Sequence, residues 1–213
     1  HLESLAEIRA IAMDKTGTIT AGRPQIVAMA TVPGVDEVRL LSLAAALERR
    51  SEHPIARAVV LAAEARGVPT LTADGVAAIK GKGLEGTLQG SRLQAGSPRL
   101  LAESGAPVPA ALQRHIAELD AQGHTIMAVL LDGAPVGAIA LSDRERPDAR
   151  TAIARLQSLG VRPVVMLTGD RTPVAQAIGA SVGVDEVRAQ LLPEDKIAAV
   201  RELLEKHHAI AMV

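Results

Sequence analysis

Asp14 is followed by residue types that could place a reactive carboxylate in a tight polar turn. Residues 14–18 read Asp-Lys-Thr-Gly-Thr. Lys15 would hold positive charge beside the carboxylate, Gly17 would permit a tight turn, and the two threonine hydroxyl groups could donate hydrogen bonds. A carboxylate can attack phosphorus and form an aspartyl-phosphate. A lone aspartate at such a point is more often a cap or loop residue, so the case for Asp14 depends on other residues.

Two further pieces of sequence could supply the groups that phosphoryl transfer needs. Thr168, Gly169 and Asp170 follow the apolar run Val164–Leu167, and Lys196 lies near the predicted start of a helix. Phosphoryl transfer needs positioning and charge stabilisation more than covalent help. A hydroxyl group from Thr168, an ammonium group from Lys196 and a Mg²⁺ ion held by carboxylates would supply both. Taken alone, Lys196 would be interpreted as a solvated helix lysine.

The elements that carry these residues are predicted to form an α/β domain. The runs Ile8–Met13 and Val164–Leu167 are short, apolar and closed by polar loops, which is typical of buried strands. Asp14 and Thr168 would then lie at the carboxyl ends of strands, where open α/β sheets bind ligands. The other predicted elements are helices at Pro147–Leu159, Pro173–Gly179 and Pro193–His207, and a strand at Ala209–Val213.

Between these pieces the pattern changes to that of an α+β insert. Asp36 is expected to cap a helix that runs to Arg49, and Pro54 to open a helix that ends near Gly67. Five glycines between positions 75 and 90 favour hairpins. The remaining predicted elements are a strand at 26–30, a helix at 108–122 and a hairpin of 125–131 with 135–141. We therefore predict a discontinuous α/β domain, residues 1–22 and 142–213, with residues 23–141 inserted into it.

Composition excludes several classes of function. The net charge of −1 leaves no excess of positive charge to attract nucleic acid, and the absence of cysteine excludes disulfides and thiolate metal sites. No charge-free apolar run approaches the roughly 20 residues that span a bilayer, and no signal peptide is evident. We therefore expect a soluble chain that binds no nucleic acid. Because it starts at His1 without a methionine, we expect it to be a piece of a longer protein.

These motifs resemble those of the P-type ATPases. Residues 14–20, Asp-Lys-Thr-Gly-Thr-Ile-Thr, match the phosphorylation motif of that family. Residues 168–170 match its TGD motif, and Pro193 with Lys196 matches its PxxK motif. The three motifs occur in the family's order, and the resemblance covers essentially the whole chain. It implies a haloacid dehalogenase-like, Rossmann-like parallel sheet with an inserted nucleotide-binding domain.

The resemblance also implies roles for individual residues. Asp14 would be phosphorylated by ATP, Thr168 and Lys196 would contact the phosphoryl oxygens, and Asp170 would lie near the nucleotide and the hinge. The catalytic residues implied in this way are Asp14, Lys15, Thr16, Thr168, Gly169, Asp170 and Lys196.

A Mg²⁺ ion is implied at the same place. By resemblance it would be held by Asp14, by the backbone carbonyl of Thr16 and by an aspartate of a GDGxND motif. Residues 210–213 resemble the strand that leads into that motif, which the sequence does not contain. We therefore expect phosphorylation of this chain by itself to be impaired.

The insert resembles the heavy-metal (P1B) branch of the family. His53 lies in the tetrapeptide Ser-Glu-His-Pro of that branch, and Glu48 precedes it by five residues, as in the branch. By resemblance, His53 would orient the nucleotide and Glu48 would meet the adenine. Gly81 and Gly83 match the branch's GxG motif, although hairpin glycines are the alternative explanation. Ser97 stands where many copper-type members carry Asn, and it is a further nucleotide-binding candidate.

The leading hypothesis is the ATP-binding and phosphorylation unit of a heavy-metal pump, in the cytoplasmic portion of a membrane protein. Its partner would be the transmembrane domain of the same pump, where the transported ion would bind. Ser97 and the run Leu191–Lys196 favour zinc, cadmium or cobalt over copper.

Two alternatives stay open. A phosphatase of the haloacid dehalogenase-like superfamily would use residues 23–141 as a cap, but such enzymes carry a second aspartate where this chain has Thr16. The chain could also bind nucleotide only. Among the other charged residues, we expect Arg144–Arg146 to be a solvated hinge and His207–His208 a frayed helix end.

Overall fold

The computed structural model describes residues 7–69 and 71–213. These residues form two compact units. Unit 1 contains the described residues up to Arg23 together with Asp143–Val213, and unit 2 is Pro24–Ser142. Each limit lies one residue from the boundary expected from the sequence, and each unit has its own sheet and its own core.

Unit 1 is built on a parallel sheet of four strands in the order β10-β1-β8-β9. The strands are β1 (Ala10–Asp14), β8 (Val164–Leu167), β9 (Glu186–Arg188) and β10 (Ile210–Met212). All four residues of β8 are fully buried, as expected where helices cover both faces of a parallel sheet. Asp14 pairs with Leu167, so the end of β1 lies beside the residue that follows β8.

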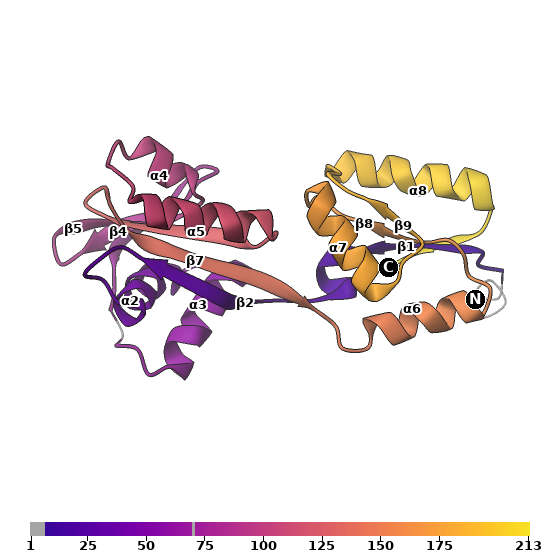
Figure 1. Ribbon diagram of the computed structural model, residues 1–213, viewed down its shortest axis with the longest axis horizontal. Coiled ribbons are helices and arrows are strands. Elements are labelled where there is room, and N and C mark those ends of the chain that lie inside the picture. Colours follow the sequence, from indigo (N-terminus) through magenta and orange to yellow (C-terminus); the bar gives the residue numbers. More distant parts are fainter. Residues whose placement is uncertain (1–6, 70) are drawn as a thin grey trace. The chain divides into compact units, whose positions relative to one another are not determined.

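Helices cover both faces of this sheet (Figure 1). On one face, α6 (Ala149–Ser158) and α7 (Thr172–Val182) pack against alternate residues of β1 and β8. On the other face lies α8 (Pro193–His207), which contributes Ala199 and Leu203 to the core. Pro193 occupies the first turn of α8, where its missing N–H costs nothing.

Unit 2 is built on a sheet of six strands in the order β2-β7-β6-β5-β4-β3. The paired strands from β3 to β7 are antiparallel. In chain order the strands are β2 (Thr20–Thr31), β3 (Asp74–Ile79), β4 (Gly83–Leu88), β5 (Ser91–Gly96), β6 (Thr125–Leu131) and β7 (Ala134–Glu145). Because β2 begins in unit 1 and β7 ends there, these two strands are the covalent connections between the units.

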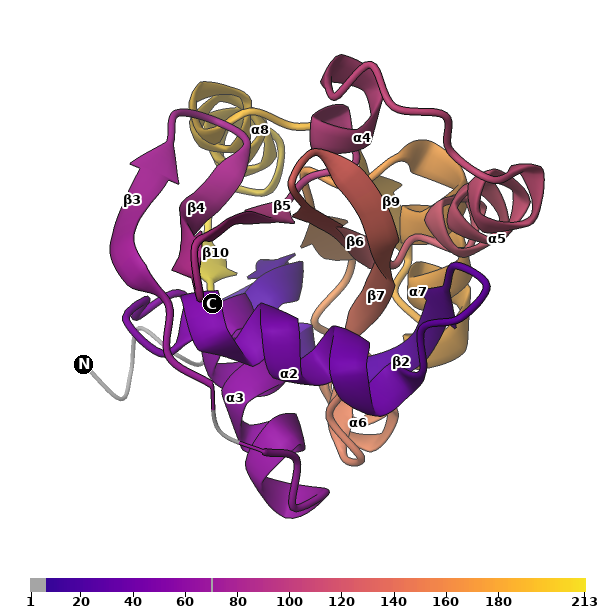
Figure 2. The ribbon, with the colours of Figure 1, turned by 90° about the vertical axis from the view of Figure 1, so that its left-hand side faces the viewer.

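The six strands curve around α2 (Glu37–Glu48) and α3 (Pro54–Ala65), while α4 (Arg99–Glu103) and α5 (Ala110–Ala121) lie on the other face (Figure 2). Leucines, alanines and valines fill the core between α2, α3 and the sheet. The cap of α2 is the predicted one, because Asp36 accepts a hydrogen bond of 2.7 Å from the N–H of Arg39.

Some elements differ from those expected. Helix α4 and strand β9 were not predicted, because segments this short carry no clear periodicity. Helix α7 continues past Gly179 to Val182. Gly179 therefore does not end the helix. A Cβ at this position would come within 2.3 Å of Val187 Cγ2, so the glycine allows α7 to pack closely against β9. None of the described helices combines the length and apolar character that a membrane span requires.

Candidate functional site

Asp14 forms an ion pair with Lys196 at the carboxyl end of the unit 1 sheet. The Nζ of Lys196 lies 2.8 Å from the Oδ1 of Asp14. The two side chains remain 25% and 34% exposed, respectively, so a ligand can reach both. Strand β1 is held between two neighbours here, because the N–H of Asp14 donates to the carbonyl oxygen of Val213. A central buried strand therefore carries the carboxylate, and the first turn of α8 carries the ammonium group.

Lys15 follows Asp14 directly, but its ammonium group pairs with another carboxylate. Its Nζ lies 2.7 Å from the Oδ2 of Asp170. The reason is tertiary: α8 brings Lys196 to Asp14, and β8 brings Asp170 beside Lys15. Each of these two ammonium groups is therefore paired with a carboxylate, and the four charges balance. The hydrogen bonds expected from the Thr16 and Thr18 hydroxyl groups are not found among the described residues.

The Thr168–Asp170 loop is held from several sides. Thr168 is 2% exposed, and its Oγ1 accepts a hydrogen bond of 3.1 Å from the N–H of Asp170. The hydroxyl hydrogen of Thr168 therefore remains available to another acceptor. The N–H of Leu191 donates to the carbonyl oxygen of Thr168, and a Cβ on Gly169 would lie 3.3 Å from the carbonyl oxygen of Leu191. Gly169 thus lets two loops approach closely.

Arg146 holds the wide turn Lys15–Ile19 that follows Asp14. Its Nε donates to the carbonyl oxygen of Thr18 and its Nη2 to that of Gly17, both at 3.0 Å. Gly17 has φ of 83°, a conformation that glycine adopts without strain. Arg144–Arg146 are exposed, as a solvated segment would be, but the contacts of Arg146 with the turn were not predicted. No local sequence signal indicated this contact, since its partners lie more than 120 positions away.

Asp143 fixes the segment that leads from this turn into β2. Its Oδ2 accepts hydrogen bonds from the Oγ1 of Thr20 at 2.5 Å and the N–H of Gly22 at 3.0 Å. Its Oδ1 accepts one of 2.9 Å from the N–H of Arg23. Asp143 therefore joins the two strands that connect the units, at their unit 1 ends, and keeps the Asp14 turn in register with the returning chain.

The residues at this edge suit a magnesium ion better than a tightly enclosed metal. Across residues 7–69 and 71–213, no three His, Asp or Glu side chains are grouped so that they could hold a metal. Mg²⁺ commonly binds through one or two carboxylates, several waters and the phosphates of a substrate. Asp14 and the backbone carbonyl of Thr16, on an exposed residue, fit that donor set.

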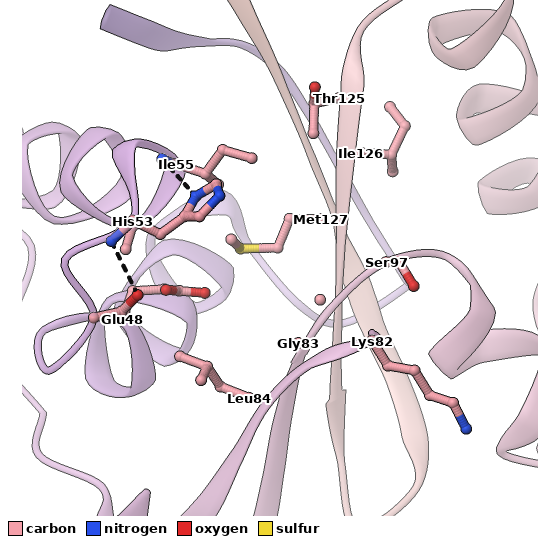
Figure 3. A pocket seen from close by; sticks show the side chains of 13 residues that line it. Glu48, His53, Ile55, Lys82, Gly83, Leu84, Ser97, Thr125, Ile126 and Met127 are labelled. Atoms are coloured by element: carbon pink, nitrogen blue, oxygen red, sulfur yellow. Dashed lines mark hydrogen bonds between the residues drawn. The ribbon is translucent and has the colours of Figure 1, made fainter. Parts of the chain in front are cut away.

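Unit 2 contains a second candidate site, a cavity of about 350 Å³ between the helices and the sheet. Figure 3 shows His53 and Glu48 on one side of it and the β4–β5 region on the other. Ile55, Leu84 and Met127 give it an apolar lining. An apolar cavity with a few polar groups at its border is typical of small-molecule sites.

The His53 imidazole is oriented by the backbone of α3. His53 is the N-cap of α3, and its Nδ1 accepts a hydrogen bond of 3.2 Å from the N–H of Ile55. In the neutral ring the proton is then on Nε2, which can donate to a ligand. The N–H of His53 donates to the Oγ of Ser51 at 3.3 Å. The local sequence explains this arrangement, since Pro54 begins the helix directly after His53.

Glu48 is a buried acid at the end of α2. It is only 6% exposed, although its side chain is charged when ionised. Burial raises the pKa of Glu48 from 4.5 to about 7. Near neutral pH the carboxyl group can therefore carry a proton and act as a hydrogen-bond donor within the cavity.

The other residues implied to bind nucleotide differ in position. Gly83 and Ser97 line the cavity, whereas Gly81 does not. A Cβ on Gly83 would lie 2.1 Å from the carbonyl oxygen of Ala95, so this glycine is required by the close approach of β4 and β5. Gly81 has φ of 70° and no neighbour at its Cβ position, which is typical of a turn glycine. The Oγ of Ser97 is buried and has no partner among the described residues.

Comparisons with known proteins agree on the family. The model of the haloacid dehalogenase-like hydrolases matches residues 8–213. A copper-transporting P-type ATPase of Rhizobium leguminosarum bv. viciae is 44% identical over 211 residues, 99% of this chain and 25% of the relative. The zinc/cadmium/lead-transporting P-type ATPase of Escherichia coli (strain K12) is 40% identical over 212 residues, all of this chain and 28% of the relative.

Solved structures of heavy-metal ATPases are also similar to this chain. A zinc-transporting PIB-type ATPase in the E2.Pi state has a TM-score of 0.76 at 39% identity, over 99% of this chain and 34% of that chain. The catalytic domain of the CPx-ATPase CopB-B, solved in a study of conformational changes upon nucleotide binding, has a TM-score of 0.72 at 25% identity and is covered to 72%. The chain thus spans about a quarter to a third of the length of the transporters it matches.

Proposed function

The chain belongs to the haloacid dehalogenase-like hydrolase family and aligns along its whole length with heavy-metal P-type ATPases, and we propose that it is the phosphorylation and nucleotide-binding part of such a pump. Unit 1 is then the phosphorylation domain and unit 2 the nucleotide-binding domain. The remainder of the pump carries the transmembrane domain and the site of the transported ion, and this chain lies on the cytoplasmic side.

Asp14 is the proposed nucleophile. A carboxylate oxygen of Asp14 attacks the γ-phosphorus of ATP, the bond from phosphorus to the bridging oxygen of ADP breaks, and ADP leaves with that oxygen. Water later attacks the same phosphorus, releases inorganic phosphate and regenerates the carboxylate. The 2.8 Å ion pair between Asp14 and Lys196 is the observation that carries this proposal, because it places a fixed positive charge where phosphoryl oxygens would gather.

The neighbouring groups have supporting roles. The hydroxyl group of Thr168, which has a free hydrogen, donates to a phosphoryl oxygen. Lys15, held by Asp170, adds a second positive charge. A Mg²⁺ ion, bound through Asp14 and the carbonyl of Thr16, would neutralise phosphate charge when present. Arg146 and Asp143 keep the turn after Asp14 in place, so that the carboxylate is oriented before the substrate arrives.

Unit 2 is proposed to bind the nucleotide in its apolar cavity. The adenine ring lies among Ile55, Leu84 and Met127, with Glu48 as a hydrogen-bonding partner for its edge. The Nε2 of His53 donates to the nucleotide and helps to orient it. The cavity's apolar lining and the orientation of His53 by Ile55 support this arrangement.

The transported ion is not specified by these residues. The relatives named above carry different ions in their names, copper in one case and zinc, cadmium or lead in the other. An ion of this heavy-metal group is proposed, bound outside the part described here.

The phosphatase alternative is disfavoured by the position of Thr16. In that mechanism a second acid near the nucleophile assists hydrolysis, but Thr16 has no carboxylate, and the nearby Asp170 is occupied by Lys15. A long-lived phosphoenzyme is therefore favoured over rapid turnover. Efficient release of phosphate from small phosphoesters by the purified chain would reverse this ranking.

The decisive experiment is labelling with ³²P in a pump that carries this chain. Incubation with γ-labelled ATP and Mg²⁺, followed by acid quenching, is expected to give an acid-stable phosphoenzyme that hydroxylamine cleaves. Asp14→Asn is expected to abolish the label, while Asp148→Asn, an exposed aspartate of the same unit, retains it. Persistent labelling of Asp14→Asn would refute the proposal, and binding of ATP without any labelling of the wild type would favour a nucleotide-binding role alone.

A further inference from the structure

Lys82 lies between the two glycines of the β3–β4 hairpin and borders two cavities. One is the apolar cavity with His53 and Glu48. The other is a polar cavity of about 300 Å³, which Glu103 of α4 also lines. The Lys82 ammonium group forms an ion pair with the Glu103 carboxylate. Figure 3 shows the Lys82 side chain directed away from His53 and Glu48.

The distribution of charge around the apolar cavity is uneven. Among the described residues that line it, Lys82 is the only lysine or arginine, while Glu48 and His53 lie across the cavity from it. A polyanionic tail would be attracted by the Lys82 ammonium group, and the described residues on the Glu48 side of the cavity offer no comparable positive charge. A nucleotide in this cavity would therefore place its phosphates on the side of Lys82 and its base on the side of Glu48.

Lys82 is able to change partners at small cost. Its side chain is 34% exposed and that of Glu103 is 54% exposed. Ion pairs this accessible to water are weak, since solvent screens the charges and two flexible side chains must be ordered. A lysine ammonium group on its four-carbon stem can also reach several positions around one backbone site. Phosphate oxygens, with several negative charges, can compete with a single exposed carboxylate.

We propose that Lys82 binds the phosphate groups of the nucleotide in unit 2, and that Glu103 competes with those phosphates for the same ammonium group. This inference rests on the proposed nucleotide-binding function and extends it to two residues whose types the motifs do not specify. Lys82 then makes the site prefer nucleotides over nucleosides, and Glu103 weakens that preference. An ATP complex forms with the Lys82–Glu103 pair broken.

Calorimetric titration of ATP and of adenosine into the chain tests this competition. Glu103→Gln is expected to lower the Kd for ATP by about two- to fivefold, the size of an exposed ion pair, and to leave the Kd for adenosine unchanged. Lys82→Met is expected to raise the Kd for ATP by about tenfold, since a charge-assisted contact is lost, again with no change for adenosine. In the double variant the effect of Glu103→Gln is expected to vanish.

Glu85→Gln is the matched control. Glu85 lines the same polar cavity and is paired with Arg92, but it does not line the apolar cavity. The Glu85→Gln substitution removes one negative charge near Lys82 but leaves the Lys82–Glu103 ion pair in place, so the Kd for ATP should stay constant. Equal effects of the Glu85 and Glu103 variants, or a Glu103→Gln effect that persists beside Lys82→Met, would overturn the competition.

The outcomes separate this inference from the function on which it rests. A wild-type chain that binds no ATP would refute the proposed nucleotide site and, with it, the role of Lys82. A chain that binds ATP with the same Kd in the wild type, Lys82→Met and Glu103→Gln would refute this inference alone. Unchanged circular dichroism of each variant would show that a change in Kd does not come from unfolding.

Discussion

The ammonium group of Lys196 lies 2.8 Å from the carboxylate of Asp14, although the two residues are 182 positions apart. The contact forms because α8 packs on the sheet through Ala199 and Leu203, against Ala12 of β1 among others. An ion pair with both partners partly exposed contributes only about 0–1 kcal/mol to stability. The ion pair therefore adds little to the stability of the fold. Its position at the strand end agrees with a role in stabilising charge on a phosphoryl group.

Replacing Lys196 by methionine is expected to slow aspartyl-phosphate formation by about 10²- to 10³-fold, because developing charge on the phosphoryl group loses a fixed cation. Lys196→Arg should recover part of the rate. The measurement is the rate of labelling by ³²P-ATP in rapid-quench experiments on the pump. Lys206→Met, at the exposed end of the same helix, serves as the control. A comparable loss in that control would point to damage to α8.

Replacing Arg146 by alanine is expected to loosen the turn after Asp14. Two side-chain hydrogen bonds to Gly17 and Thr18 are lost, with a local cost of about 1–2 kcal/mol. Hydrogen exchange of the backbone amides between Gly17 and Thr20 should become about 5- to 30-fold faster. Arg144→Ala, at a neighbouring exposed position, should leave these rates unchanged. Equal protection in Arg146→Ala and the wild type would contradict the assigned role.

Alanine substitutions at Gly81 and Gly83 are expected to differ sharply. At Gly81 the added Cβ meets no atom within 4 Å, so the cost is the left-handed conformation alone, about 1–2 kcal/mol. At Gly83 the Cβ would overlap the backbone of Ala95 and Gly96, and we expect about 3 kcal/mol or more. Thermal unfolding and ATP titration should both rank Gly83→Ala as the more damaging variant. The reverse order would refute the distinction between turn and packing glycines.

The stability of unit 2 is expected to depend on pH through Glu48. Because burial raises its pKa from 4.5 to about 7, the folded unit retains a proton that the unfolded chain loses above pH 4.5. The contribution of Glu48 to stability is therefore most favourable below pH 4.5 and falls as the pH rises to about 7. Above that pH the full penalty of the buried charge remains, at most about 3 kcal/mol.

Glu48→Gln removes this penalty while preserving the size of the side chain. We expect the variant to be more stable than the wild type above pH 7 and similar to it below pH 4.5. Calorimetric unfolding of the chain between pH 4 and 9 measures the difference. Glu52→Gln, at an exposed position, should show no such dependence. If the unfolding stabilities of the wild type and Glu48→Gln changed in parallel with pH, ionisation of the buried Glu48 could not be the cause of the pH dependence.

Local signals in the sequence predicted many elements of the fold. Pro193 marked the start of α8, Asp36 marked the cap of α2, and the apolar run Val164–Leu167 became the buried strand β8. Each of these features depends on the backbone geometry or the apolar character of a few consecutive residues, so the sequence alone is enough to predict it. Helix α4 is five residues long and had no such signal, so Glu103 could not be placed near Lys82.

The sequence by itself determined which chemical groups are available: Asp14 in a tight turn, Thr168 after a second strand, Lys196 in a first helical turn, and His53 before Pro54. Only the tertiary structure decided how these groups are paired. In the strand order β10-β1-β8-β9, Asp170 in the loop after β8 pairs with Lys15, while Asp14 pairs with Lys196. Arg146, which follows the returning strand β7, binds the turn after Asp14. The reason is physical: caps and strands are set by neighbouring residues, whereas an ion pair depends on which strands lie together when the core is buried.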